Sequence, residues 1–426
     1  MNIRKNQRDL PPEEKRRFIN AVLALKNSTP SQRGLSNRYD DYVMIHQESM
    51  SGMTSTYPGW AHQGPAFLPW HRVFLRRLEL DLQAADRSLG NDGNIALPYW
   101  DWTLDNLPDS SIWGADFMGG NGRDGDGRVM DGPFAFDSSN WTLNIHDPGN
   151  PNPGPDLRRR FGTFPNVTQL PTVTQVEQTL AETRYYVAPW RAFEDLFTQA
   201  GVAQPSFCNR LEGWYGAGSI HNRVHLWVAG GTPPQFANAG AMFWGTSPND
   251  PVFFLHHCNI DRLWAEWQRR TQSLQYQPSG VGSEVGPTGH NLNDPMQPWG
   301  GDATPANALA HSPLGYQYDT EPVIDDLAPS HVALVINNLR EHVPAPIRMD
   351  STAGHGHGHG HGHPVPMFGL SAEDKASGEE GGTNTVPPST GGTSTPPHDA
   401  RPDSEGHHLP MFGLSAEDKA DGGEIY

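Results

Sequence analysis

The sequence predicts a mainly α-helical fold with long irregular loops and few short strands. Several segments repeat apolar residues at the three-to-four spacing of amphipathic helices. The stretches between them are rich in Gly, Pro, Asp and Asn, which favours loops. Near residue 350 the composition changes abruptly to a low-complexity sequence. We therefore expect a helical part followed by a disordered C-terminal tail.

The helical patterns lie on both sides of a long loop-like stretch. The predicted helices span residues 11–26, 38–50, 70–86, 174–200, 219–228 and 251–271. The first begins behind a proline and an acidic turn, which is typical of a helix N-terminus. Residues 104–165 and 272–320 read as irregular loops, and residues 331–336 lean towards a strand. The 426-residue chain is long enough to bury a sizeable core.

Charge and cysteine content exclude several classes of function. The formal net charge is −18, which argues against a nucleic-acid partner. Cys208 and Cys258 are too few for a disulfide framework, and we expect buried thiols, with a single bridge as the alternative. No apolar run suits a signal peptide or a membrane span. We therefore expect no membrane contact, and a location in the cytoplasm or export together with a partner.

Two groups of histidines are the candidate functional residues. They are His46, His62 and His71 in one group, and His221, His225 and His257 in the other. On a helix, His221 and His225 present both imidazoles on one face. Six imidazoles without a bridging carboxylate argue against di-iron, Mg, Ca and Mn sites and leave copper or zinc. Three nitrogens per ion leave each ion an open position, which suits reduction of dioxygen by two copper ions.

The residues around these histidines resemble the two copper signatures of the tyrosinase family. HQGPAFLPWHRVFLRRLE, residues 62–79, is similar to the first signature, and DPVFFLHHCNID, residues 250–261, to the second. LPYWDW at 97–102 and GYQYD at 315–319 also resemble family landmarks. The resemblance covers roughly residues 8–325. It implies a four-helix bundle that holds a dicopper centre, with each histidine group binding one copper ion.

The resemblance also implies roles for residues near the second group. Glu212 and Asn222 have the spacing of the family pair that holds and activates a water, so that a monophenol can lose its proton. The alternative is a buried structural acid and a helix-surface amide. His256, beside His257, is expected to support the site or to pack and not to bind copper. Asp261 is expected to support His257, because a ligating histidine usually donates its other ring N–H to a carboxylate or carbonyl.

Three residues are candidates for the substrate pocket. Phe253, one turn before His257, is expected to pack against the ligand imidazoles. Leu226 stands where bacterial tyrosinases often carry a basic residue, which leaves the preference for carboxylated phenols such as tyrosine open. Trp244 lies where a side chain overhangs the copper in relatives, and packing alone is the alternative. Trp60 replaces the cysteine that forms a thioether in fungal and plant relatives, so the chain resembles the bacterial branch.

The function implied is that of a tyrosinase with two copper ions, which uses dioxygen to hydroxylate monophenols and to oxidise o-diphenols to o-quinones. Catechol oxidase and o-aminophenol oxidase without monophenol activity are alternatives within the enzyme class. An oxygen carrier similar to the hemocyanins is the alternative from another class, and copper storage rests on the tail alone. The expected partners are phenolic small molecules, dioxygen and a caddie protein that delivers copper.

We divide the chain into a dicopper catalytic domain at residues 1–325, a linker at 326–350 and a tail at 351–426. Alternating histidines in the tail offer accessory copper binding, and they are His355, His357, His359, His361 and His363. The segment PMFGLSAEDKA occurs at 366–376 and again at 410–420. One hypothesis is that this motif docks on the catalytic domain, with Phe368 or Phe412 blocking the copper site, or on a partner. The alternative for the whole tail is a solvated spacer.

Overall fold

The structure is a computed structural model, and it describes residues 1–50, 59–190, 204–214, 220–232 and 236–322. The α-helices in these ranges are α1 (Pro12–Asn27), α2 (Arg38–Ser49), α3 (Phe67–Ser88), α4 (Phe136–Ser139), α5 (Val173–Leu180), α6 (Phe207–Glu212), α7 (Ile220–Ala229) and α8 (Val252–Thr271). The same ranges contain short 3₁₀ turns, namely η1 (Gln7–Asp9), η2 (Ser111–Trp113), η3 (Ala241–Phe243), η4 (Ser247–Asn249), η5 (Ala306–Ala308) and η6 (Ser312–Leu314). The strands are β1 (Asn2–Arg4) and β2 (Tyr316–Tyr318). The mainly helical fold class is confirmed.

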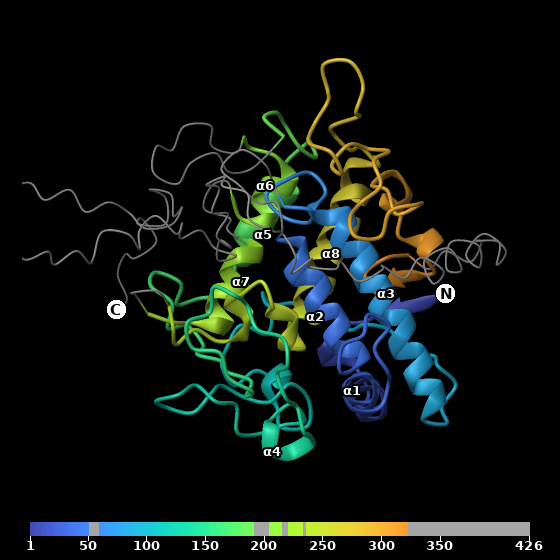
Figure 1. Cartoon of the computed structure of the whole chain (residues 1–426). Helices are drawn as coiled ribbons and strands as arrows, with labels where there is room; N and C mark the ends of the chain where they lie inside the picture. The colour runs from blue at the N-terminus through green and yellow to red at the C-terminus, as the bar shows by residue number, and fades with distance from the viewer. Residues whose placement is uncertain (51–58, 191–203, 215–219, 233–235, 323–426) are drawn as a thin grey trace, which may run out of the picture.

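A four-helix bundle of α2, α3, α7 and α8 forms the centre of the molecule (Figure 1). Helices α3 and α7 both pack against α8, and α1 packs across α2 and α3. Aromatic side chains fill the space between the helices: the ring of Phe74 on α3 lies 5.6 Å from Tyr42 on α2 and 5.7 Å from Phe254 on α8. Burial of such large apolar surfaces is the main force that holds helices together. The bundle predicted for the histidine groups is therefore present.

The long helix α3 is buried over most of its length, including its charged side chains. Arg72 on α3 donates to Asp261 on α8 at 2.6 Å. Glu79 receives two hydrogen bonds from Arg4, at 3.1 and 3.0 Å, and one from Arg76 at 2.7 Å. Buried carboxylates must be paired, since desolvation of a lone charge is costly. Through Arg4, these ion pairs connect the N-terminal end of the described chain to the bundle.

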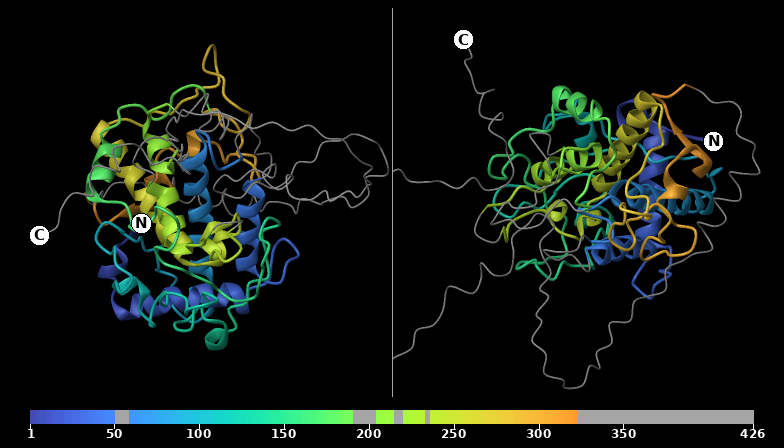
Figure 2. Two further views of the ribbon diagram at one scale, coloured as in Figure 1. Left: turned by 90° about the vertical axis from the view of Figure 1, so that its left-hand side faces the viewer. Right: turned by 90° about the horizontal axis from the view of Figure 1, so that it is seen from above.

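The strands β1 and β2 pair in parallel, with Arg4 opposite Tyr318, so the N-terminus lies beside the last described residues (Figure 2). Arg4 is fully buried and also donates to Asp261 at 3.2 Å. It therefore links α3 to α8. The sequence suggested no role for this N-terminal strand.

One predicted helix is too long. The pattern at 174–200 predicted helix throughout, but α5 ends at Leu180 and residues 181–190 contain no helix. Tyr185 and Tyr186 are both buried although they are adjacent, and Pro189 cannot donate a helical hydrogen bond. Tertiary packing of the two tyrosines therefore overrides the local pattern. Residues 191–200 of that prediction lie outside the described ranges.

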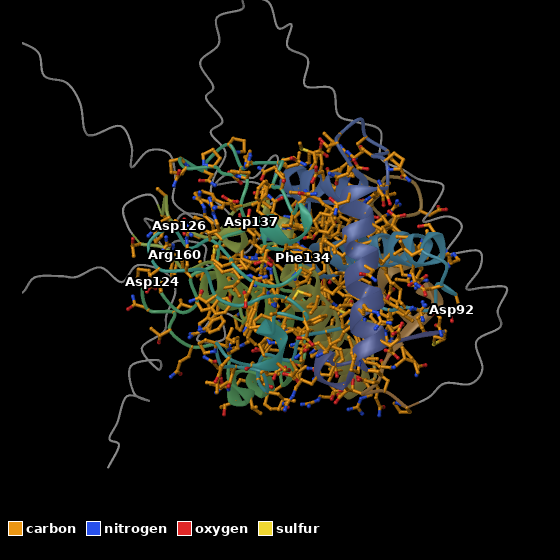
Figure 3. All side chains as sticks on the ribbon, turned by 90° about the horizontal axis from the view of Figure 1, so that it is seen from below. Asp92, Asp124, Asp126, Phe134, Asp137 and Arg160 are labelled. Atoms are coloured by element: carbon orange, nitrogen blue, oxygen red, sulfur yellow. The ribbon has the colours of Figure 1, made fainter. Side chains whose placement is uncertain are left out.

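The loop-rich stretch at 104–165 is irregular, as predicted, with α4 and η2 as its short helices. Its acidic side chains Asp124, Asp126 and Asp137 are exposed on the face shown in Figure 3.

Cys208 and Cys258 are both free and buried, so the expectation of thiols is confirmed. No helix in the described part of the chain is long and apolar enough to cross a membrane. The linker, the strand-like run at 331–336 and the tail, with its five alternating histidines and repeated motif, lie outside the described residues.

Candidate metal centre

The second histidine group lies on α7 and α8. His221 and His225 project from the same face of α7, and their Nε2 atoms each lie 3.2 Å from Nε2 of His257 on α8. His225 donates its Nδ1 proton to the carbonyl of Met242 at 2.8 Å. A neutral imidazole that donates from Nδ1 keeps a free lone pair on Nε2. The group therefore presents nitrogen lone pairs to one small volume, as a bound cation requires.

The first histidine group combines two helical residues with one residue from a loop. His46 on α2 donates from Nδ1 to the Gly245 carbonyl at 2.7 Å, and His71 on α3 donates to the Phe67 carbonyl at 2.8 Å. The ring of His62 lies 5.0 Å from each of these two imidazoles. The ligand atoms of the three histidines lie within 4.8 Å of one another. The structure thus brings both predicted groups together.

The two groups face each other in a dry interior. The six histidines are at most 4% exposed, and the rings of His71 and His257 stack across the groups at 4.3 Å. Burial lowers the pKa of His46 to about 4 and that of His221 to about 3. Neutral imidazole is the form that binds a metal ion. The Nε2 atoms of His46 and His71 have no hydrogen-bond partner among the described residues, so the donor set fits two copper ions.

The aromatic wall predicted next to the ligands is present. Phe253 stacks on His257 with ring centroids 4.0 Å apart and contacts His46 at 4.8 Å. The expectation that Asp261 supports His257 is wrong. Asp261 accepts hydrogen bonds from Arg72, Arg4, Tyr316 and Tyr318 and not from the ring of His257, because those donors occupy both carboxylate oxygens. Arg72 pairs with Asp261, and Glu79 pairs with Arg4.

His256 lies near enough to the second group to be a fourth ligand by distance alone. Its Nδ1, however, accepts the indole N–H of Trp102 at 3.2 Å. A neutral imidazole that accepts at Nδ1 carries its proton on Nε2 and has no lone pair left for a metal ion. The ring instead stacks on His221 at 5.2 Å. This geometry favours a supporting role for His256, as the sequence suggested.

Glu212 and Asn222 both approach the ring of His221. Its Nδ1 lies 3.0 Å from Oδ1 of Asn222 and 3.2 Å from the backbone oxygen of Glu212. Gly213 has φ +112° and makes room for Asn222, whose side chain lies 3.0 Å from where a Cβ would stand. Glu212 accepts the N–H of Gln63 through Oε1 at 2.7 Å, and the Trp214 side chain also contacts its carboxylate. Burial raises the pKa of Glu212 to about 8. Asn222 is only 8% exposed, so it is not a helix-surface residue.

The other two pocket candidates are buried beside the second group. Leu226 follows His225 on α7 and is 7% exposed, and Trp244 is 3% exposed. Trp244 belongs to the segment whose neighbouring carbonyls, Met242 and Gly245, accept from His225 and His46. It also lines a surface cavity with Arg158 and Asn249. The structure therefore places Trp244 next to residues that orient histidines of both groups.

Comparison with known proteins identifies the family. Residues 36–270 match the common central domain of tyrosinase. The chain belongs to the tyrosinase family. Over 321 residues it is 43% identical to a tyrosinase from Streptomyces glaucescens, across 75% of this chain and the whole relative. A Streptomyces antibioticus tyrosinase is 44% identical over 73% of this chain and 97% of its own length. Grixazone synthase from Streptomyces griseus is 39% identical over 75% of this chain and 99% of its own.

As a member of the tyrosinase family, the chain is a copper-dependent enzyme with two copper ions as its cofactor. It uses dioxygen to hydroxylate monophenols and to oxidise o-diphenols to o-quinones. Phenolic small molecules and dioxygen are therefore its reaction partners. Neither an oxygen carrier nor a storage protein is better supported by these relatives.

The sequence did not predict the groups that orient the buried histidines of this tyrosinase family member. The carbonyls of Gly245 and Met242 accept from His46 and His225, and Trp102 sets the tautomer of His256. No local pattern marks a backbone carbonyl as a hydrogen-bond acceptor for a distant histidine. Trp102 lies in the LPYWDW landmark, but the motif does not reveal its contact. Such partners depend on the tertiary fold.

Proposed function

We propose that His46, His62 and His71 bind one copper ion, that His221, His225 and His257 bind the other, and that Glu212 with Asn222 gives the enzyme its monophenol activity. Bound copper supplies the redox chemistry by which dioxygen oxidises the phenol. The protein has to remove the phenol proton, because a phenol with a pKa near 10 is mostly neutral at physiological pH. Glu212 is the base in its ionised form, which the positive charge of bound copper would favour against the protonated form that burial favours, and Asn222 holds a water beside it.

The observation that carries the proposal is the position of the buried residue Glu212, which contacts both histidine groups directly or through their neighbours. Its Oε1 accepts a hydrogen bond from the N–H of Gln63, the residue directly after His62. Its backbone oxygen lies 3.2 Å from Nδ1 of His221. Glu212 thus stands between the two histidine groups. The Trp214 side chain also contacts its carboxylate, whose oxygens keep lone pairs that can accept a proton through a water.

The substitution Glu212→Gln tests this role. Glutamine keeps an oxygen for the Gln63 N–H but cannot accept a proton as a carboxylate does. We expect oxygen uptake with a simple monophenol to fall roughly 100-fold while uptake with a catechol stays within a few fold. The control Glu182→Gln changes a partly exposed acid paired with Arg210, and should leave the ratio of the two rates unchanged. An equal loss of both activities in Glu212→Gln would contradict the base assignment.

Leu226, Trp244 and Phe253 form the proposed walls of the substrate pocket. Leu226 offers a phenol an apolar surface and no positive charge for a carboxylate. Simple monophenols and catechols are therefore the substrates we propose, ahead of tyrosine. Oxygen uptake with tyrosine and with a neutral phenol of similar size distinguishes these preferences.

We also propose that a separate caddie protein delivers the copper. The enzyme is proposed either to stay in the cytoplasm or to be exported together with that protein. Six ligands that are at most 4% exposed give copper little direct access from solvent. Co-expression with a candidate partner, followed by measurement of copper per chain, tests the delivery. The tail histidines from His355 to His363 are an alternative means of delivering copper to the site, and truncation of the chain near residue 350 removes them.

A further inference from the structure

The ring of His62 is held differently from its neighbours in the first group. His46 and His71 each donate from Nδ1 to a backbone carbonyl, at 2.7 and 2.8 Å. Neither ring nitrogen of His62 has a hydrogen-bond partner among the described residues. His62 also lies in a loop, residues 59–66, and not in a helix. The direction of its ring therefore depends on how firmly the backbone of this loop is held.

A single buried imidazole connects the two ends of that loop. The Nδ1 atom of His290 accepts the Ala66 N–H at 3.2 Å, and its Nε2 donates to the Gly59 carbonyl at 2.9 Å. His290 is fully buried, and burial lowers its pKa to about 4. Both bonds are satisfied by one neutral tautomer, with the proton on Nε2. His290 comes 228 positions after His62 in the chain, so no local sequence pattern connects the two.

His290 is itself fixed, and other contacts act on the same loop. The hydroxyl of Tyr276 donates to the backbone oxygen of His290 at 2.8 Å. The hydroxyl of Tyr185 donates to the Pro65 carbonyl at 2.6 Å. Gln63, directly after His62, has φ +61°, a left-handed conformation that costs energy for a residue with a side chain. A loop held in such a conformation needs firm contacts on both sides.

We propose that His290 is a positioning residue for the first copper ion: it closes the loop at residues 59–66 so that His62 presents a ring nitrogen to that ion. His290 is not a ligand, because both of its nitrogens are engaged. This inference rests on the proposed assignment of His62 as a copper ligand. It assigns His290 no contact with the phenol, so its effect is on copper retention and on rates that depend on the first copper ion.

The experiment compares the copper-loaded full chain with three variants. His290→Phe keeps a ring in the cavity but removes both hydrogen bonds. His290→Asn keeps an oxygen near the position of Nδ1 that can accept the Ala66 N–H. The control His311→Phe removes a histidine from the same part of the chain, where it pairs with Glu321 and does not touch the loop. Each protein is dialysed against a graded series of a copper chelator, and copper per chain, the Cu(II) EPR signal and the melting temperature are measured.

We expect His290→Phe to lose one of its two copper ions at roughly tenfold lower chelator concentration than the unchanged chain, because partners that orient ligands typically contribute that much affinity. Loss of one ion from a spin-coupled pair leaves a lone Cu(II) ion, which gives an EPR signal that the pair lacks. His290→Asn should recover part of the retention, and His311→Phe should match the unchanged chain. Copper retention equal to that of the unchanged chain would overturn the proposal, as would simultaneous loss of both ions together with a lower melting temperature.

The unchanged chain separates this inference from the proposed function. If it fails to retain two copper ions at all, the assignment of the six histidines is wrong. If it retains two, and His290→Phe retains two equally well, only the role of His290 is wrong.

Discussion

The two histidine groups are built in different ways. All three histidines of the second group lie on α7 and α8, where helical spacing determines the direction of each ring. The first group takes His46 and His71 from helices but His62 from a loop whose ends are joined by a distant imidazole. A helix orients a histidine ring through its own geometry, whereas the direction of a ring on a loop depends on tertiary contacts. The first group should therefore be the more sensitive to substitutions far from the metal ions.

Substituting one histidine in either group should have the largest effect. The two substitutions should lower copper content and oxygen uptake to a similar extent. We expect His62→Ala and His225→Ala each to retain one copper ion per chain and to show no measurable oxygen uptake with catechol, because one ion alone cannot transfer two electrons to dioxygen as the pair does. Metal analysis of the purified proteins measures the copper content. The exposed His146 provides the control, and His146→Ala should retain both ions. Two ions in either ligand variant would contradict the assignment.

Arg4 connects α3, which carries His71, to α8, which carries His257, because it pairs with Glu79 on α3 and Asp261 on α8. Arg4→Met should lower the free energy of unfolding by about 3–5 kcal/mol at neutral pH, since it leaves buried carboxylates without a partner. Urea denaturation measures this loss. Lys5→Met, which breaks a half-exposed pair with Glu14, should cost less than about 1 kcal/mol. Similar losses in the two variants would show that the strand contributes little to the bundle.

The pH dependence of this loss has a definite sign. Burial alone would raise the pKa of Glu79, but Arg4 and Arg76 hold it below its usual value. A carboxyl whose pKa is lowered on folding stabilises the protein above its unfolded pKa, and this contribution disappears as pH falls through the folded value. The difference between the unchanged chain and Arg4→Met should therefore be largest near neutral pH and narrow below about pH 4. A difference that grows on acidification would contradict the assignment of Glu79.

Gly245→Ala should have the smallest of these effects and should act on the first group alone. A Cβ at Gly245 would lie 2.5 Å from Oε1 of Gln47 and 2.9 Å from Oδ2 of Asp147, so the segment must shift and carry with it the carbonyl that accepts from His46. We expect about tenfold weaker retention of one copper ion in chelator titrations. Gly120→Ala, whose Cβ would only touch Asp131 at 3.4 Å, is the matched control. Equal retention in both variants would show that the carbonyl of Gly245 is dispensable.

The sequence by itself determined the fold class, the family and the histidines to be tested as ligands. Helical periodicity is a local property, so α1, α2, α3, α7 and α8 could be read within a few residues of their bounds. The signatures around His71 and His257 are equally local, and they carried the resemblance on which the dicopper centre was predicted. The helix predicted at residues 181–190 is absent, because burial of adjacent tyrosines outweighs the helical pattern there.

Only the tertiary structure decided which groups orient these histidines. Asp261 lies one helical turn from His257, yet its oxygens are taken by Arg4, Arg72 and two tyrosines from elsewhere in the chain. His290 and the carbonyl of Gly245 reach the first group from positions far away in the sequence. The physical reason is that a hydrogen bond depends on distance and direction in space, which spacing along the chain specifies only within a single helix or strand.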